Sequence, residues 1–220
     1  MKIEILNYTK YLSHNCVLSD INLTLESGKI YGFTGKNGSG KTMLMRAVCG
    51  LIMPSSGEVR IDGKILGKDI SFPESVGVLI ENPGFTPNCS GFKNLKFLAQ
   101  IQNRIGNEDI RNTLEKVGLD PDDKKSFRKY SLGMKQKLGI AAAIMENPKL
   151  LILDEPFNAL DEETSDKIRS IILSYRSKDH IIILSCHDKE KIETLCDVIV
   201  EIQDGSVLTT TNIVRDDDNG

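Results

Sequence analysis

The stretch Gly35-Lys36-Asn37-Gly38-Ser39-Gly40-Lys41-Thr42 decides how the rest of the chain is interpreted. It matches the phosphate-loop pattern G-x-x-x-x-G-K-[ST] at every fixed position. The apolar run 30–34 predicts a short buried strand before it, and 43–49 predicts the helix that follows. In that setting, glycine-rich backbone and a helix N-terminus turn N–H groups toward an anion. The alternative, a glycine-rich surface turn before a helix, leaves the Lys-Thr pair unexplained.

The pattern assigns separate tasks to its last two residues. Lys41 can reach the β and γ phosphates of a nucleotide, and the Thr42 hydroxyl can ligate Mg²⁺. We therefore predict a site for a nucleotide with Mg²⁺. Its loop residues are Gly35, Asn37, Gly38, Ser39, Gly40, Lys41 and Thr42.

Composition narrows the class of protein. The chain has 220 residues, of which 40% are hydrophobic and 27% charged, as is typical of soluble globular proteins. A net charge of −3 argues against a bulk nucleic-acid binder. No apolar run reaches the roughly 18 residues that span a bilayer, and the first residues do not resemble a signal peptide. Five scattered cysteines indicate a reduced, cytosolic compartment.

Patterning along the chain predicts an α/β fold with an inserted helical region. Alternating or continuous apolar runs predict strands at 3–6, 21–25, 58–61, 76–80, 150–153 and 181–184, and a terminal hairpin at 198–202 and 207–210. Helical patterns predict helices at 92–101, 110–117, 132–145 and 161–175. We expect one domain, 1–220. Residues 1–82 and 146–210 would form a phosphate-loop core around a mixed sheet, with an N-terminal antiparallel β subdomain. Residues 83–145 would form an inserted helical subdomain, and 211–220 a disordered tail.

Two carboxylates follow the buried strand 150–153. Ligand sites gather at the carboxyl ends of parallel strands, so Asp154 is placed to complete the Mg²⁺ site with Thr42. Glu155 could polarise the attacking water as a general base. His187 ends another buried strand, and in a parallel sheet it would lie at the same edge, within reach of a γ-phosphate. The alternative for these residues is a solvated or structural role.

Two other features could contact a nucleotide but are weak signals when taken alone. Ser131 is a favoured N-cap for the helix 132–145, and with Gly133 the first helical turn could accept an anion, although such a cap is usually only structural. Tyr8 and Tyr11 lie in the expected first loop, where an aromatic face such as that of Tyr11 could stack a nucleotide base. Packing against the sheet edge is an equally good interpretation of either tyrosine.

These elements together resemble the ATP-binding cassette family of transporter ATPases. The resemblance spans about residues 1–210 and rests on six ordered elements: Gly35–Thr42, Glu81, Tyr130–Gln136, Leu150–Glu155, Asn158–Asp161 and His187. It implies a head-to-tail dimer with a second copy or a paralogous cassette, in which Ser131 and Gly133 bind the γ-phosphate held by the partner's loop. It also implies a membrane permease partner and a place on the cytoplasmic face of the membrane. Asn158–Asp161 would couple the two sites.

Two positions depart from the usual family spelling. The signature usually reads Leu-Ser-Gly-Gly-Gln, and here Leu132 replaces its first glycine. The family's glutamine after the strand 76–80 is Glu81, which can ligate Mg²⁺ but cannot donate a hydrogen bond when it is ionised. The runs 79–85 and 130–136, which contain these two departures, resemble the corresponding runs in ATPases of bacitracin and lantibiotic export and self-immunity systems.

Two alternatives to an exporter subunit stay open at this point. One is a cassette ATPase that acts in translation or chromosome maintenance. Those proteins usually carry two cassettes or long coiled coils, whereas Thr42 and Ser131 are separated by about 90 residues without heptads. The other is a small-molecule kinase built on the same loop, which would require neither the signature helix nor His187.

Overall fold

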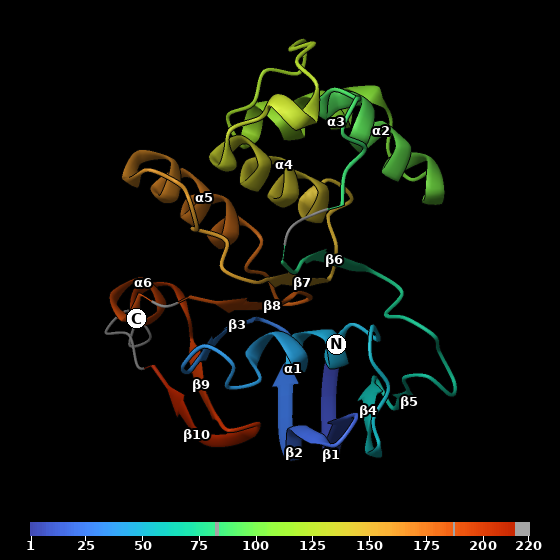
Figure 1. Cartoon of the computed structure of the whole chain (residues 1–220), viewed down its shortest axis with the longest axis vertical. Coiled ribbons are helices and arrows are strands. Elements are labelled where there is room, and N and C mark those ends of the chain that lie inside the picture. The colour runs from blue at the N-terminus through green and yellow to red at the C-terminus, as the bar shows by residue number, and fades with distance from the viewer. Residues whose placement is uncertain (82–83, 187, 214–220) are drawn as a thin grey trace.

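The computed structural model describes residues 1–81, 84–186 and 188–213 (Figure 1). Its strands are β1 (Lys2–Leu12), β2 (Asn15–Glu26), β3 (Lys29–Thr34), β4 (Ser56–Ile61), β5 (Lys64–Ile65), β6 (Val76–Leu79), β7 (Leu150–Leu153), β8 (Ile181–Ser185), β9 (Val198–Gln203) and β10 (Ser206–Asn212). Its α-helices are α1 (Lys41–Val48), α2 (Gly91–Gln102), α3 (Asn107–Lys116), α4 (Leu132–Ile144), α5 (Glu162–Ser174) and α6 (Lys189–Leu195), with a 3₁₀ turn at Phe127–Lys129.

A mixed sheet forms the centre of the described residues. Its strand order is β10-β9-β3-β8-β7-β6, and all neighbours are parallel except β10, which pairs antiparallel with β9. The carboxyl ends of β3, β7 and β8 therefore lie at one edge, as predicted. The sheet places the phosphate loop after β3 beside the residues that follow β7 and β8.

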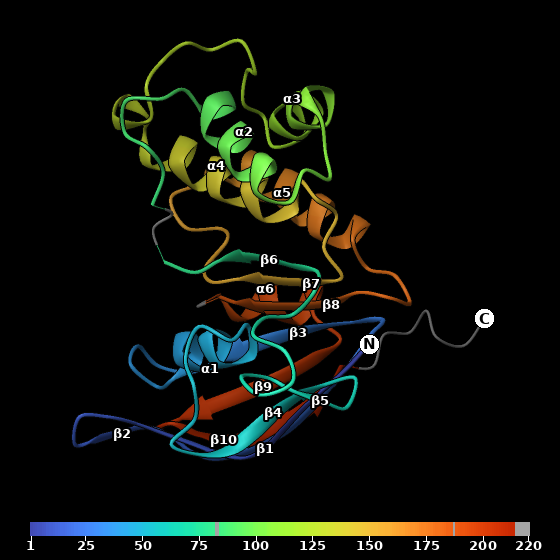
Figure 2. The same ribbon diagram turned by 90° about the vertical axis from the view of Figure 1, so that its right-hand side faces the viewer.

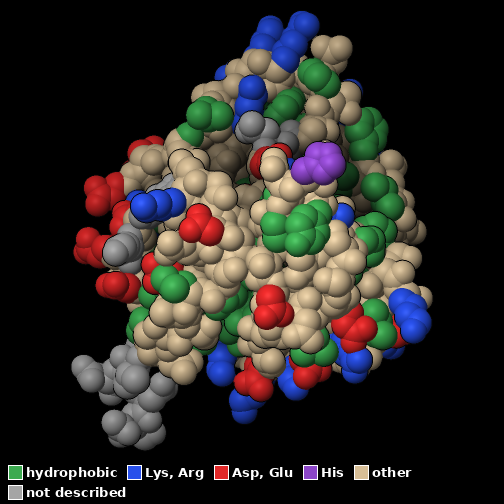
Figure 3. Space-filling model, turned by 60° about the horizontal axis from the view of Figure 1, so that its bottom comes forward, with side chains coloured by type: hydrophobic (Ala, Val, Ile, Leu, Met, Phe, Trp, Pro, Cys, Tyr) green, Lys and Arg blue, Asp and Glu red, His purple; other side chains and the backbone are tan. Residues whose placement is uncertain are grey.

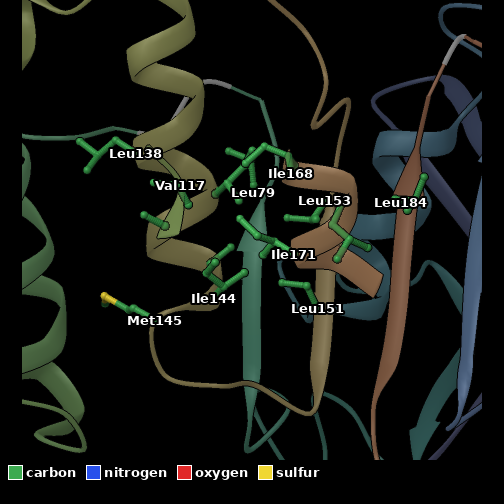
Figure 4. Close-up of a cluster of buried hydrophobic side chains, with 14 of the residues drawn as sticks. Leu79, Val117, Leu138, Ile144, Met145, Leu151, Leu153, Ile168, Ile171 and Leu184 are labelled. Carbon is green, nitrogen blue, oxygen red and sulfur yellow. The ribbon is translucent and has the colours of Figure 1, made fainter. Parts of the chain in front are cut away.

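The central strands are buried on both faces. In β7, Leu151 and Leu153 pack into one hydrophobic cluster (Figure 4), while Leu150 and Ile152 pack into another on the opposite face. Side chains alternate between the faces of a strand, so a continuous apolar run is what a strand covered on both sides requires. This explains why the runs 150–153 and 181–184 are uniformly apolar.

Helices cover one face of the sheet, as the two views show (Figures 1 and 2). Helices α2, α3, α4 and α5 lie beyond β6 and β7. The α4 side chains Leu138, Ala141 and Ile144 pack into the cluster that also holds Ile168 of α5. The expected helices are thus present with boundaries shifted by at most three residues. The boundary of a separate helical subdomain at 83–145 stays a prediction.

A second sheet packs against α1 on the side that faces away from the central sheet. Its order is β2-β1-β4-β5, with antiparallel pairing throughout, and α1 lies between it and the central sheet (Figure 1). The prediction that Tyr8 and Tyr11 lie in a loop is wrong, because both belong to β1. Tyr8 is fully buried and its hydroxyl donates to the Ile52 carbonyl oxygen at 3.1 Å. Burial raises the pKa of Tyr8 to about 12.

The surface carries charges of both signs. On the lower face, blue Lys and Arg side chains alternate with red Asp and Glu side chains along the rim (Figure 3). This arrangement agrees with the small net charge of −3. Within the described part of the chain, no helix is both long and apolar enough to cross a membrane.

Candidate functional site

The phosphate loop connects β3 to α1 and is closed around its own lysine. The Lys41 ammonium donates to the carbonyl oxygens of Gly35 at 2.7 Å and Lys36 at 3.0 Å, and the side chain is buried. The Ser39 hydroxyl is also buried and has no hydrogen-bond partner among the described residues. A buried unpaired hydroxyl is costly, so a group that supplies acceptor oxygens fits here.

A cavity of about 470 Å³ lies beside this loop. Its lining residues are Cys16, Val17, Asn37, Gly38, Ser39, Gly40, Lys41, Thr42, Met43, Asp154, Glu155, Asp204 and Gly205. Six of the seven predicted loop residues line it, and Gly35 lies at the base of the loop. The prediction missed the wall formed by β2 and the β9–β10 turn, because contacts between distant segments leave no local pattern. Tyr11 is exposed near the end of β1 and does not line the cavity.

The Asp154 carboxylate is fixed by two hydroxyl groups. Thr42 Oγ1 donates to Asp154 Oδ2 at 2.7 Å, and Ser185 Oγ donates to Asp154 Oδ1 at 2.5 Å. Ser185 also accepts the Glu155 backbone N–H at 2.9 Å. The prediction overlooked Ser185, although its place at the end of the buried strand 181–184 was the same signal that pointed to Asp154.

These groups fit a magnesium ion. Thr42 and Asp154 offer oxygen ligands within hydrogen-bond distance of each other, next to a loop that suits phosphate. Among the described residues, no three His, Cys, Asp or Glu side chains are grouped into a metal site. Mg²⁺ typically uses one or two protein oxygens and completes its shell with phosphates and water, so this small ligand set suits it.

A second cavity of about 520 Å³ meets the first at the two carboxylates. It is lined by Glu81, Leu132, Gln136, Asp154, Glu155, Asn158 and Ala159. The backbone is left-handed at Glu81, Glu155 and Ala159, with φ of 57°, 51° and 59°. Non-glycine residues rarely adopt this conformation, and it clusters at functional sites. The Gln136 side-chain amide donates to the Glu155 carbonyl oxygen at 2.9 Å, which joins α4 to this turn.

Ser131 lies at the N-cap position directly before α4. Its hydroxyl accepts the Met134 N–H at 3.2 Å as the N-cap, and Ser131 is exposed. Neither Ser131 nor Gly133 lines the cavity beside the phosphate loop of its own chain. Gly133 packs against the loop 158–161, where a Cβ on it would come within 2.9 Å of the Ala159 carbonyl oxygen. The first turn of α4 is therefore open to a group outside this chain.

Glu81 carries an ion pair that the sequence pattern did not indicate. Its Oε1 lies 2.7 Å from Nη2 of Arg46, which belongs to the last turn of α1. His187, Asn82 and Pro83 lie outside the described residues. The expected disordered tail, 211–220, begins too early, because Thr211 and Asn212 belong to β10, and its residues 214–220 are not described.

Comparison with known proteins decides the family. The family model described as "ABC transporter" matches residues 18–158. This chain belongs to the ABC transporter family. It is the ATP-binding ATPase subunit of an ABC transporter, as the predicted resemblance implied. The mixed sheet, the antiparallel β sheet and the helical region likewise confirm the predicted fold class.

Several relatives are similar over almost the whole chain. It is 44% identical over 217 residues to the uncharacterized ABC transporter ATP-binding protein YybJ of Bacillus subtilis, covering 99% of this chain and 100% of YybJ. It is 42% identical to the bacitracin transport ATP-binding protein BcrA of Enterococcus faecalis, covering 96% of this chain and 69% of BcrA. It is 35% identical to the lantibiotic transport ATP-binding protein SrtF of Streptococcus pyogenes, covering 94% of this chain and 89% of SrtF.

The fold matches a solved cassette closely. The dimeric structure of MJ0796, a bacterial ABC transporter cassette, superimposes with a TM-score of 0.87 at 22% identity. The match covers 97% of this chain and 99% of that one. The arrangement of sheets and helices is therefore that of a cassette ATPase.

Proposed function

We propose that this subunit binds and hydrolyses ATP in a head-to-tail dimer, with a second copy or a paralogous cassette. The dimer drives a separate membrane permease from the cytoplasmic face of the membrane. The observation that carries this proposal is a separation within one chain. Thr42, Asp154 and Glu155 line the cavity beside the phosphate loop, whereas Ser131, the exposed N-cap of α4, does not line it. A partner's Ser131 and Gly133 can complete the site.

Each residue at the cavity has a task in this proposal. Lys41 leaves the carbonyl oxygens of its own loop to pair with the β and γ phosphates of ATP, and the loop N–H groups surround them. Thr42 and Asp154 would hold Mg²⁺, which when bound neutralises charge on the phosphates. Glu81 is a further candidate ligand. The Glu155 carboxylate takes a proton from the attacking water, and His187 hydrogen-bonds the γ-phosphate.

The transported class is proposed from the relatives. BcrA and SrtF are named for bacitracin and lantibiotic transport, and this chain is 42% and 35% identical to them. We propose an exporter of peptide antibiotics, drugs or lipid-like molecules. A cassette that moved other cargo would keep the same ATP site, so the cargo is a proposal separate from the ATPase activity.

An exposed apolar face supports the permease part of the proposal. Helix α2 follows Glu81 by ten residues and exposes Phe97, Leu98 and Ile101, the last to 77%. Large apolar side chains grouped on a soluble surface mark sites of protein contact. We place the permease contact over the segment from Glu81 to Phe97 and the adjoining turns of α2.

The change Glu155→Gln tests the catalytic assignment. Gln keeps the size of the side chain but cannot accept the water's proton, so turnover should fall at least a hundredfold, the scale of general-base catalysis. ATP binding should stay within about threefold, because the loop and its lysine are untouched. Released ADP and phosphate with Mg²⁺ present measure turnover, and a fluorescent ATP analogue measures binding. The matched control is Glu163→Gln, an exposed carboxylate in the first turn of α5.

Three results would contradict this assignment. Wild-type turnover in Glu155→Gln would remove the proposed base. A phosphorylated small molecule in place of free phosphate would identify a kinase instead. Loss of turnover in the Glu163→Gln control would show that charge removal near α5 acts through the fold and not through the water.

A further inference from the structure

Helix α1 contacts two carboxylates from the same face. Thr42 and Arg46 are four residues apart, so they lie one turn apart on one side of the helix. Thr42 pairs with Asp154 at 2.7 Å, and Arg46 pairs with Glu81 at 2.7 Å. The helix that begins at the phosphate loop therefore fixes both the Asp154 carboxylate and the segment that leads to α2.

We propose that Arg46 is a positioning residue for ATP hydrolysis, which holds the Glu81 carboxylate at the rim of the catalytic cavity. This inference rests on the proposed function of the site and assigns a role to a residue outside it. Arg46 lines neither cavity, so it acts through Glu81.

Charge crowding explains why Glu81 needs a cation. Glu81, Asp154 and Glu155 line one cavity, and three like charges there repel one another and the phosphates of ATP. A neutral glutamine at position 81 would create no such repulsion. The side chain of Arg46 is 30% exposed and that of Glu81 is 61% exposed, so solvent screens the pair and its effect is moderate.

The backbone at Glu81 gives a second reason for an anchor. Its φ of 57° is a conformation that glutamate adopts at a cost, so neighbouring contacts must hold it there. The planar guanidinium of arginine is suited to fix a carboxylate in one orientation. A fixed Glu81 can face Mg²⁺ and the attacking water in the same geometry at each turnover.

A purely structural role for Arg46 has to be separated from this one. Its Nη1 also lies 3.8 Å from the Met43 sulfur, so removing the side chain changes packing on α1. Gln and Glu have nearly the same shape and differ in charge. The variants Arg46→Gln and Arg46→Glu therefore lose the same packing but differ in their effect on Glu81.

The experiment measures ATP turnover of Arg46→Lys, Arg46→Gln and Arg46→Glu with Mg²⁺ at saturating ATP. We expect Lys to retain at least half of the wild-type kcat, Gln to lose about fourfold, and Glu to lose clearly more, because it repels Glu81. The KM for ATP should change less than twofold, since the phosphate loop is intact. Equal losses in Gln and Glu would show a packing role and overturn the proposal, as would wild-type kcat in both.

A double-mutant cycle tests whether Arg46 acts through Glu81. In a Glu81→Gln background, Arg46→Gln should change kcat by less than 1.5-fold, because the charge that Arg46 balances is gone. The same fourfold loss in both backgrounds would contradict the pairing. If Glu81→Gln alone hydrolyses ATP too slowly to measure, the comparison of Arg46→Gln with Arg46→Glu still distinguishes a charge role from a packing role.

A matched control lies in the helical region. Arg111 pairs with Asp122 at 2.5 Å in a similarly exposed ion pair. Neither of these residues lines either cavity. Arg111→Gln should leave kcat and KM unchanged. Failure of the proposed function has its own signature, since wild-type protein would then release no phosphate, whereas failure of this inference requires an active wild type.

Discussion

At the scale of single residues, the chemistry depends on a few fixed carboxylate oxygens. Both oxygens of Asp154 accept hydrogen bonds from hydroxyl groups, one from Thr42 and one from Ser185. A carboxylate held this way needs little reorganisation when it meets a cation. The role of Asp154 could be predicted because an apolar run led to it, and Ser185 could have been predicted by the same rule.

Other residue roles could not be predicted from local pattern. Tyr8 is flanked by the polar residues Asn7 and Thr9, yet it packs in the core because β1 continues past the point where its alternation fades. Arg46 and Glu81 meet only because α1 and the end of β6 are brought together by the fold. A pairing between residues so far apart has no periodicity to reveal it.

The cysteines offer a direct test of the cavity at this scale. Cys16 is exposed and lines the cavity, whereas Cys89 is partly buried and does not line it. We expect Mg²⁺ and ATP to slow alkylation of Cys16 at least fivefold and to leave Cys89 unchanged, as measured by mass spectrometry of peptides. Burial raises the pKa of Cys49 to about 11, so at pH 8 its thiolate fraction is about 10⁻³ and it should not react. Equal labelling of Cys16 with and without ATP would place the nucleotide elsewhere.

At the scale of elements, the turn between β9 and β10 supports the phosphate loop. The Gly205 N–H donates to the Ser39 carbonyl oxygen at 2.8 Å, and the Gly205 carbonyl oxygen accepts the Ser19 N–H at 2.8 Å. The terminal hairpin was predicted from its alternation and its Asp-Gly turn. Its contact with the phosphate loop was not, because the two segments are distant in sequence.

Replacing Gly205 tests whether this support matters for binding. Its φ is +79°, and an added Cβ would lie 2.8 Å from the Val17 carbonyl oxygen. Gly205→Ala should lower the free energy of unfolding by about 2 kcal/mol and weaken ATP binding several-fold. Gly63→Ala is the matched control, since its φ is +81° with open space around the Cβ. It should cost about 1 kcal/mol in denaturant unfolding and leave ATP affinity unchanged. Equal ATP affinities in the two variants would remove the support role.

The lengths of some elements could not be predicted from the hydrophobic pattern. β1 and β2 were expected as short strands at 3–6 and 21–25, but they span Lys2–Leu12 and Asn15–Glu26. Their pairing is interrupted by register shifts after Ile5, and shifts of this kind break the period of two that identifies a strand. Helix α6 was not predicted, because seven residues are too few to show a helical period.

At the scale of the whole molecule, the residues of the proposed site belong to two separate parts of the fold. The phosphate loop and Asp154 follow strands β3 and β7 of the central sheet, while Ser131 is the N-cap of α4. Helix α4 lies in the helical layer above that sheet (Figure 2). Leu132 beside Ser131 is 63% exposed, so this end of α4 presents an apolar side chain to solvent. Both observations are explained if a second cassette covers this end of α4.

The mass of the Glu155→Gln variant in solution tests this central claim most directly. Slow hydrolysis should trap the closed state, so light scattering after gel filtration with Mg²⁺ and ATP should show about twice the monomer mass of 24.4 kDa. Without ATP, and in Glu155→Gln combined with Ser131→Arg, the mass should stay that of a monomer. A Glu155→Gln protein that binds ATP but stays monomeric, or a dimer that forms equally well with Ser131→Arg, would contradict the account.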